Sequence, residues 1–401
     1  MREQITRRNF ISSAAATMAL AHISPGCRSI GVRRTEYPSS MGLDITTVAE
    51  ASKDFPRHDT ATVIERGDGS LMIAWMEYVG SALIGHDHAP CNIASMISRD
   101  GGYTWSDRRI LVENHPDDAN IHFPWLLRLP GGQILFYYLI RHYLRPREVA
   151  RSSGILCRST DECKTFSTPV RHEVLSKLGG NGRILSRLSS GRLILPSQRY
   201  QHGIWGGPRD HQIVGCCYSD DQGDNWQESN WVDLPKRGAM EPHVVELRDG
   251  RLLMYMRTQL GAIFQSQSTD QAVTWSKPQT TGLRAPESMP CLTRIPSTGD
   301  LLLVWNHSDY DPQFDHYGKR TPLTVGISRD DGHSWQNICD IETNPEFEFT
   351  NPSCHFTSQN KVIITYVASK MRQSTGRGSL GRSRMSLKAA IADLQWFYSS
   401  G

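Results

Sequence analysis

An eight-residue motif, Ser-x-Asp-x-Gly-x-Thr-Trp with variations, recurs five times in the sequence. Its copies begin at Ser98, Ser159, Ser219, Ser268 and Ser328, at intervals of 61, 60, 49 and 60 residues. Ser and Asp side chains at this spacing hydrogen-bond the backbone of a turn, and the aromatic residue packs beneath it. We therefore interpret each copy as a structural turn within a repeated unit and not as a ligand site.

A second signal, a turn followed by an apolar run, precedes each motif and occurs once more near the C-terminus. The six copies read GDGSLMIAW, PGGQILFYY, SSGRLILPS, RDGRLLMYM, STGDLLLVW and SQNKVIITY. Short strands joined by hairpin turns form one small antiparallel sheet per unit, and a single sheet cannot bury both of its faces. Six such units predict an all-β, six-bladed β-propeller over residues 31–401, with residues 40–50 completing the last blade.

Residues 1–30 are predicted to be a leader for export. Residues 6–11 form a twin-arginine pattern around Arg7 and Arg8, and an Ala-rich apolar stretch follows at residues 11–21. Residues 19–21 offer a small-residue cleavage site, and Cys27 offers an alternative as a lipid anchor. The leader predicts export by the twin-arginine route to the periplasm or the outside of the cell.

Composition excludes several other classes of function. The 44 Lys and Arg residues nearly balance 41 Asp and Glu residues, and a net charge of +3 does not indicate nucleic-acid binding. After the leader, no apolar run reaches the roughly 18 residues that a membrane span needs. No Cys or His spacing is typical of a zinc site, so neither a metal nor a cofactor is expected. We expect a monomer.

Five charged residues map to one rim of the predicted propeller. In each unit the two turns lie at one end of the antiparallel strands, so the starts and ends of the other strands lie at the opposite end. Three arginines and two carboxylates fall there: Arg57, Arg257, Arg320, Asp87 and Glu241. Because the planar Arg side chain binds a carboxylate through two hydrogen bonds, this rim predicts a site for an anionic ligand.

On these residues the chain resembles the sialidase (neuraminidase) superfamily. The resemblance rests on the repeated Asp motifs, on the stretch from Glu241 to Arg257 and on residues 320–330. It implies that Arg57, Arg257 and Arg320 bind a sugar carboxylate. It also implies that Asp87 acts as the acid and base, and that Glu241 assists a nucleophilic Tyr.

The sequence departs from the pattern of the superfamily at two places. The usual Arg-Ile-Pro is replaced by Arg57-His58-Asp59, and the expected nucleophilic Tyr is replaced by Thr350 or Asn351. Tyr366, near the end of the second strand of the last unit, is predicted to reach the rim and act in its place. His122 is a further substrate-binding candidate, and Glu287 a reserve candidate.

The sequence therefore predicts an exported glycoside hydrolase that cleaves a terminal acidic sugar, such as sialic acid, from glycoconjugates. A lyase acting on uronic acids, with His122, His86 or a Tyr as its base, and an inverting hydrolase are alternatives on the same scaffold. A non-catalytic glycan-binding propeller is a third alternative, because a fold does not determine a function.

Overall fold

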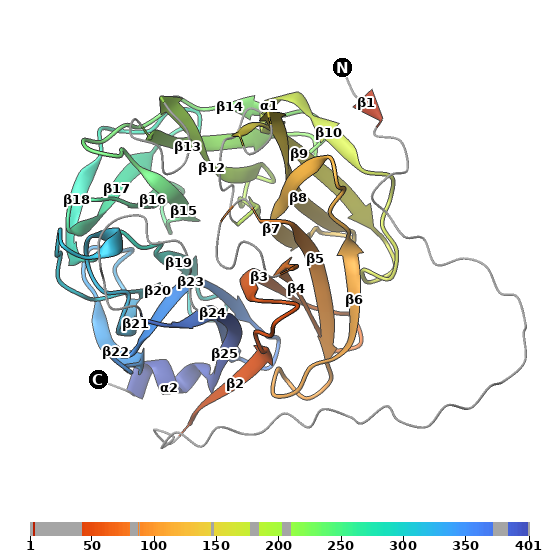
Figure 1. Cartoon of the computed structure of the whole chain (residues 1–401). Helices are drawn as coiled ribbons and strands as arrows, with labels where there is room; N and C mark the ends of the chain where they lie inside the picture. Colours follow the sequence, from red (N-terminus) through yellow and green to blue (C-terminus); the bar gives the residue numbers. More distant parts are fainter. Residues whose placement is uncertain are drawn as a thin grey trace, which may run out of the picture.

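The described residues form β-sheets that are arranged around a centre like the blades of a propeller (Figure 1). This computed structural model describes residues 3–4, 42–80, 87, 89–145, 148–176, 184–202, 210–371 and 384–399. The helical elements in these ranges are α1 (Glu173–Ser176), α2 (Leu394–Ser399) and a 3-10 turn, Asp315–Tyr317. None of the described helices is long and apolar enough to cross a membrane. The predicted all-β, propeller-like fold is confirmed.

Three of the sheets each follow a continuous part of the chain, and a fourth does so apart from one added strand. A five-stranded sheet contains β7 (Asp118–Arg128), β8 (Ile134–Arg145), β9 (Glu148–Ser159), β10 (Val170–His172) and, at its outer edge, β1 (Glu3–Gln4) from the predicted leader. Three four-stranded sheets follow, and the first contains β11 (Ser186–Arg187), β12 (Leu193–His202), β13 (His211–Ser219) and β14 (Gln227–Glu228). The second contains β15 (Met240–Glu246), β16 (Leu252–Arg257), β17 (Ala262–Ser268) and β18 (Gln279–Arg284). The third contains β19 (Cys291–Arg294), β20 (Leu301–Trp305), β21 (Leu323–Ser328) and β22 (Gln336–Glu342).

The fifth sheet joins the two ends of the chain and has eight strands. They are β2 (Leu43–Ala49), β3 (Arg57–Glu65), β4 (Leu71–Tyr78), β5 (Cys91–Ser98), β6 (Ser106–Val112), β23 (Phe347–Phe356), β24 (Lys361–Lys370) and β25 (Met385–Asp393). Hydrogen bonds thus define five sheets in the described ranges, where six were predicted. The reason is one parallel contact, Met385 with Arg57, which links two groups of four strands. As predicted, residues 40–50 complete the last group, because β2 pairs with β25.

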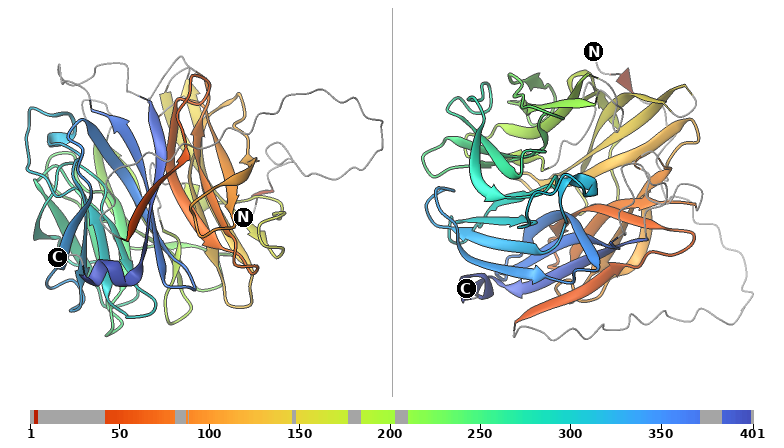
Figure 2. Two further views of the ribbon diagram at one scale, coloured as in Figure 1. Left: turned by 90° about the horizontal axis from the view of Figure 1, so that it is seen from below. Right: turned by 60° about the vertical axis from the view of Figure 1, so that its left-hand side comes forward.

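The first strand of each unit lies nearest the centre, and the strands run through the thickness of the disc (Figures 1 and 2). Four of these inner strands have a register shift of the kind made by a β-bulge. Each shift contains one non-glycine residue in the left-handed region: Thr60 (φ 33°), Phe123 (φ 57°), Glu241 (φ 46°) and Asn351 (φ 56°). Bulges redirect side chains, and strained residues of this kind gather at functional sites.

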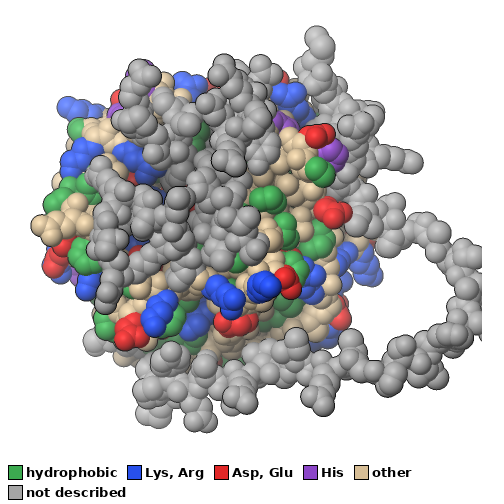
Figure 3. All heavy atoms as spheres, in the orientation of Figure 1, with side chains coloured by type: hydrophobic (Ala, Val, Ile, Leu, Met, Phe, Trp, Pro, Cys, Tyr) green, Lys and Arg blue, Asp and Glu red, His purple; other side chains and the backbone are tan. Residues whose placement is uncertain are grey.

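All five Asp motifs form the predicted turn. At the last of them, Ser328 Oγ donates to Asp330 Oδ1 at 2.8 Å, and the amide and hydroxyl of Ser334 donate to the same carboxylate at 2.8 and 2.6 Å. Equivalent bonds surround Asp100, Asp161, Asp221 and Asp270. On the face seen in Figure 1, Lys and Arg side chains are interspersed with Asp and Glu side chains over the described part (Figure 3).

These turns are expected to make folding stability depend on pH in the acid range. Hydrogen bonds from Ser334 and Ser328 lower the pKa of Asp330 from 3.8 to about 2. Because the folded-state pKa lies below the unfolded one, the stabilisation is complete above pH 3.8 and is lost as the pH falls toward 2. We expect the melting temperature to fall in this window. Asp330→Asn should lower the melting temperature at pH 7 and make it fall less in this pH window. Curves of melting temperature against pH that run parallel for the two proteins would contradict the assignment.

Candidate active site

An open cavity collects side chains from all six of the repeated units. Six of the seven site residues predicted from the sequence line it: Arg57, Asp87, His122, Glu241, Arg257 and Arg320. The other lining residues are Asp59, Thr60, Met76, Tyr78, Phe123, Arg141, Gln198, His316 and Asn351. The four residues with left-handed φ in the bulged strands are all among them, so the bulges present side chains to this cavity.

Arg257 lies between two buried carboxylates. Its Nη1 donates to Glu241 Oε2 at 2.9 Å, and its Nη2 lies 3.3 Å from Glu287 Oε1. Burial by itself lowers the pKa of Arg257, but Glu241 and Glu287 raise it above its ordinary value. For Glu287 the directions are reversed: burial by itself raises its pKa, but Arg257, His316 and Arg237 lower it to well below its ordinary value. Arg257 and Glu287 are therefore charged at neutral pH.

Arg320 is buried without such compensation. Its Nε and Nη2 donate to the backbone oxygen of Glu287 at 3.3 and 2.8 Å, and it forms no ion pair with any described residue. Burial and the neighbouring charge of Arg257 lower its pKa to about 10. Two cations thus lie close together in the cavity wall. Because a buried charge without a partner is costly, this part of the cavity is suited to an anion.

Arg57 is held by two carboxylates. Its Nε donates to Asp59 Oδ2 at 2.9 Å, and its Nη1 donates to Asp87 Oδ1 at 2.7 Å. The other oxygen of Asp59 accepts from the Asn351 amide at 2.6 Å. Asn351, at the position where the resemblance expected a Tyr, is therefore bound to the group that holds Arg57. Arg57 and Arg257 are thus each paired with two acidic side chains.

His122 contacts Tyr78 at the edge of the cavity. The Tyr78 hydroxyl lies 3.3 Å from His122 Nε2, and the Arg57 guanidinium stacks over the Tyr78 ring at 4.5 Å. Burial raises the pKa of Tyr78 well above its ordinary value, so the phenol keeps its proton. Tyr78 is the one tyrosine among the lining residues in the described part of the chain.

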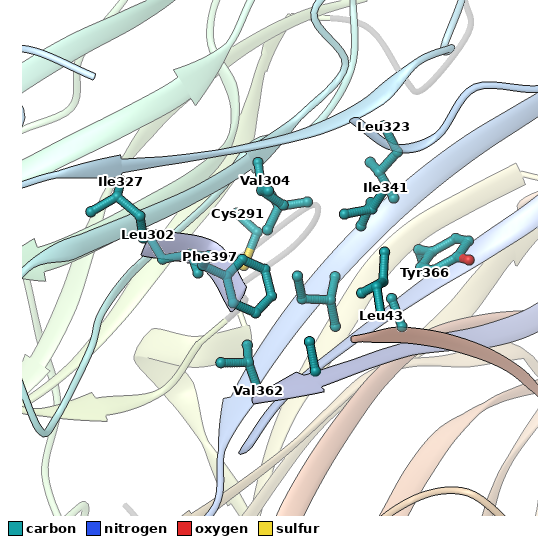
Figure 4. Close-up of a cluster of buried hydrophobic side chains, with 14 of the residues drawn as sticks. Leu43, Cys291, Leu302, Val304, Leu323, Ile327, Ile341, Val362, Tyr366 and Phe397 are labelled. Carbon is teal, nitrogen blue, oxygen red and sulfur yellow. The ribbon is translucent and has the colours of Figure 1, made fainter. Parts of the chain in front are cut away.

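Tyr366 does not line the cavity, which corrects the expectation that it reaches the rim. Its side chain is fully buried in the hydrophobic core between the last two units, beside Ile341, Leu323 and Leu43 (Figure 4). Its hydroxyl donates to Glu342 Oε1 at 2.6 Å. Side chains alternate between the two faces of a strand, and Tyr366 lies on a face that packs against the neighbouring sheet.

The sequence matches the BNR repeat-like domain family over residues 69–364. The chain belongs to the BNR repeat-like family. A sialidase of Bacteroides fragilis (strain YCH46) is 27% identical over 197 residues, which cover 45% of this chain and 33% of that protein. An anhydrosialidase of Macrobdella decora is 40% identical over 116 residues, which cover 29% of this chain and 14% of that protein. The chain thus spans a third or less of the length of these relatives.

The fold agrees with this family. The solved structure of the NanB sialidase of Streptococcus pneumoniae matches with a TM-score of 0.64 and 14% identity, covering 86% of this chain and 70% of that one. At such low identity the likeness shows a shared fold. Together, the family match, the relatives and the fold identify a member of the sialidase and BNR repeat superfamily, as predicted.

The sequence reasoning missed several residues that line the cavity of this BNR repeat-like chain. One signal could have found Arg141: it follows the hairpin glycine Gly132 by nine residues, as Tyr78 follows Gly69. Gln198 and His316 gave no comparable signal. The described residues contain no group of three His, Cys, Asp or Glu side chains that could hold a metal ion.

Proposed function

We propose that this protein is a glycoside hydrolase that removes a terminal acidic sugar, such as sialic acid, from glycoconjugates. The observation that carries the proposal is the buried Arg320, which has no ion pair among the described residues and lies beside Arg257. A sugar carboxylate would supply the missing negative charge through charge-assisted hydrogen bonds. The relatives named sialidase and anhydrosialidase support the choice of sugar.

In the proposed reaction Asp87 is the general acid. Its side chain is 17% exposed, against 2% for Asp59 and 5% for Glu241, so of these three carboxylates it exchanges protons with solvent most readily. It donates its proton to the glycosidic oxygen as the bond to the sugar breaks. Glu241 accepts a proton from a water molecule whose oxygen forms the new bond to the anomeric carbon. Arg257 Nη1, which donates to Glu241 Oε2 at 2.9 Å, orients that acceptor.

Direct attack by water is proposed because of Asn351. An amide cannot act as the nucleophile that the resemblance expected at this position, and its NH₂ group is already bound to Asp59. Tyr78, the tyrosine of the described lining, keeps its proton and contacts His122. With no tyrosine placed to form a covalent intermediate in these ranges, a single displacement with inversion at the anomeric carbon fits the cavity best.

The stereochemistry of the first product tests this proposal. We expect release of N-acetylneuraminic acid from an α-linked aryl sialoside, with the β anomer appearing first in a time-resolved proton NMR experiment. The α anomer as first product would contradict direct water attack and would indicate a covalent intermediate. Intact sialoside together with measurable binding of the sugar would favour a glycan-binding propeller.

A lyase acting on uronic acids is the second candidate, because His122 and Tyr78 form a contacting pair of proton-transfer groups beside Arg57. One of them would remove the proton next to the carboxylate while an arginine neutralised that carboxylate. The bond to the glycosidic oxygen would break as the double bond formed, and the other group of the pair would give a proton to the leaving oxygen. Ultraviolet absorbance of an unsaturated product from an oligogalacturonate would identify this activity.

We also propose that the propeller has six blades. The eight-stranded sheet then counts as two blades, β3–β6 and β23–β25 with β2, because one residue pair links them. The two sequence signals support this number, since the second of them occurs six times.

Export by the twin-arginine route is a further proposal. It rests on Arg7, Arg8 and the apolar stretch after them, which lie outside the described residues. Cleavage near residues 19–21 and lipid attachment at Cys27 would give a periplasmic or extracellular protein and a membrane-anchored one, respectively.

A further inference from the structure

Arg237 is a partly buried cation that does not line the cavity. It lies between β14 and β15, and its side chain is 14% exposed. Its Nε donates to Asp210 Oδ2 at 2.8 Å, and its Nη1 donates to Glu287 Oε1 at 2.7 Å. Arg237 therefore bridges two carboxylates behind the cavity wall, and the roles proposed above do not use it.

Glu287 connects Arg237 to both arginines of the anion site. The Oε1 atom that accepts from Arg237 also lies 3.3 Å from Arg257 Nη2. The backbone oxygen of the same residue accepts from Nε and Nη2 of Arg320. One buried residue thus fixes the direction of both guanidinium groups, although it does not line the cavity itself.

A second path links Arg237 to Glu241 and closes a ring. Asp210 accepts from Gln212 Nε2 at 2.9 Å, and Gln212 accepts in turn from the Gln198 side chain. Gln198 Oε1 accepts from the backbone N–H of Glu241 at 2.7 Å. Arg257 completes the ring by contacting both Glu241 and Glu287. The ring joins side chains from two neighbouring sheets and from the connections beside them.

The charges of this ring create a problem for anion binding that Arg237 solves. Arg257 touches two carboxylates, whose combined charge exceeds its own. An incoming anion would meet a negative group if nothing else neutralised Glu287. Arg237, although it is also paired with Asp210, contacts Glu287 more closely than Arg257 does, at 2.7 Å against 3.3 Å, and so offsets part of the Glu287 charge.

We propose that Glu287 and Arg237 are positioning residues for the anion site: Glu287 orients Arg257 and Arg320, and Arg237 neutralises Glu287 so that both arginines keep their charge for the substrate carboxylate. The inference rests on the proposed function, because it presupposes that the cavity binds an acidic sugar. It assigns a task to a residue that contacts neither the cavity nor the substrate.

The test compares Arg237→Met, Glu287→Gln and the double variant in the full chain by calorimetric titration with N-acetylneuraminic acid, galacturonic acid and acetate. Arg237→Met should weaken binding about tenfold or more, because it leaves Glu287 to compete for Arg257. Glu287→Gln keeps the shape but removes the negative charge, so binding should be as tight as in the wild type or tighter. The double variant should recover most of the affinity lost in Arg237→Met, and Arg237→Lys should also recover part of it.

The sign of these changes separates an electrostatic role from a merely structural one. If Arg237→Met and Glu287→Gln both weaken binding and the double variant is weaker still, the inference is wrong. Melting temperatures identify any variant that fails to fold. If Arg237→Met fails to fold, binding of the three acids by Arg237→Lys, which keeps the charge, is the deciding measurement. If the wild-type protein binds none of the three acids, the proposed function fails together with this inference. If it binds them and Arg237→Met binds equally well, only this inference fails.

Discussion

Glu241→Gln is expected to lower kcat for an α-sialoside by about 100- to 10,000-fold, the usual contribution of a positioned acid or base. The substituted amide keeps the shape of the side chain and can still accept a hydrogen bond from Arg257 Nη1, which lies 2.9 Å from the carboxylate. It cannot accept a proton from water. Binding of N-acetylneuraminic acid, measured separately by calorimetry, should therefore change far less than turnover.

Glu246→Gln is the matched control, because Glu246 lies at the other end of β15 and binds Ser189 outside the cavity. It should leave turnover and binding at wild-type values. A Glu241→Gln protein with unchanged kcat, alongside an inactive Asp87→Asn protein, would show that Glu241 is only an ion-pair partner of Arg257. Loss of binding in Glu241→Gln would instead indicate that the carboxylate orders the cavity.

Arg320→Met is expected to weaken binding of N-acetylneuraminic acid by about 100-fold, since it removes a charge-assisted contact from a buried site. The same substitution should not destabilise the ligand-free protein. The charge of Arg320 is buried and has no ion pair among the described residues, so a side chain of similar length without charge removes a cost of folding. We expect the melting temperature of the ligand-free protein to be maintained or raised.

The pKa of Arg320 also indicates that its charge destabilises the folded protein. It is about 10 in the folded protein, below its ordinary value, so the folded state binds this proton more weakly than the unfolded chain does. The charge therefore disfavours folding at every pH below about 10, and this cost shrinks as the pH rises above 10. Arg329→Met, at an exposed arginine of the last Asp motif, is the control and should leave ligand binding unchanged. A strongly destabilised Arg320→Met protein would mean that this guanidinium is a structural group.

The sequence alone predicted the repeat, the turns and the end of each unit at which the charged residues gather. The spacing of the Ser and Asp residues determines a local hydrogen-bond pattern, so the five turns could be read without knowing the rest of the fold. Antiparallel pairing then fixes which strand ends share a rim. Arg257, Arg320, Glu241, Asp87, Arg57 and His122 were located in this way, and all of them line one cavity.

The tertiary structure decided what strand ends cannot specify, which is the direction and the partners of each side chain. Tyr366 was placed near the right end of its strand, but its side chain points into the core between two sheets. The bulges at Thr60, Phe123, Glu241 and Asn351 depend on the packing of the inner strands, and no local sequence pattern predicts them. The bridge from Arg237 to Glu287 joins residues 50 positions apart in two separate connections between strands. Such contacts arise only when the sheets close around the centre, because the closure, and not the local sequence, brings these charges within hydrogen-bonding distance.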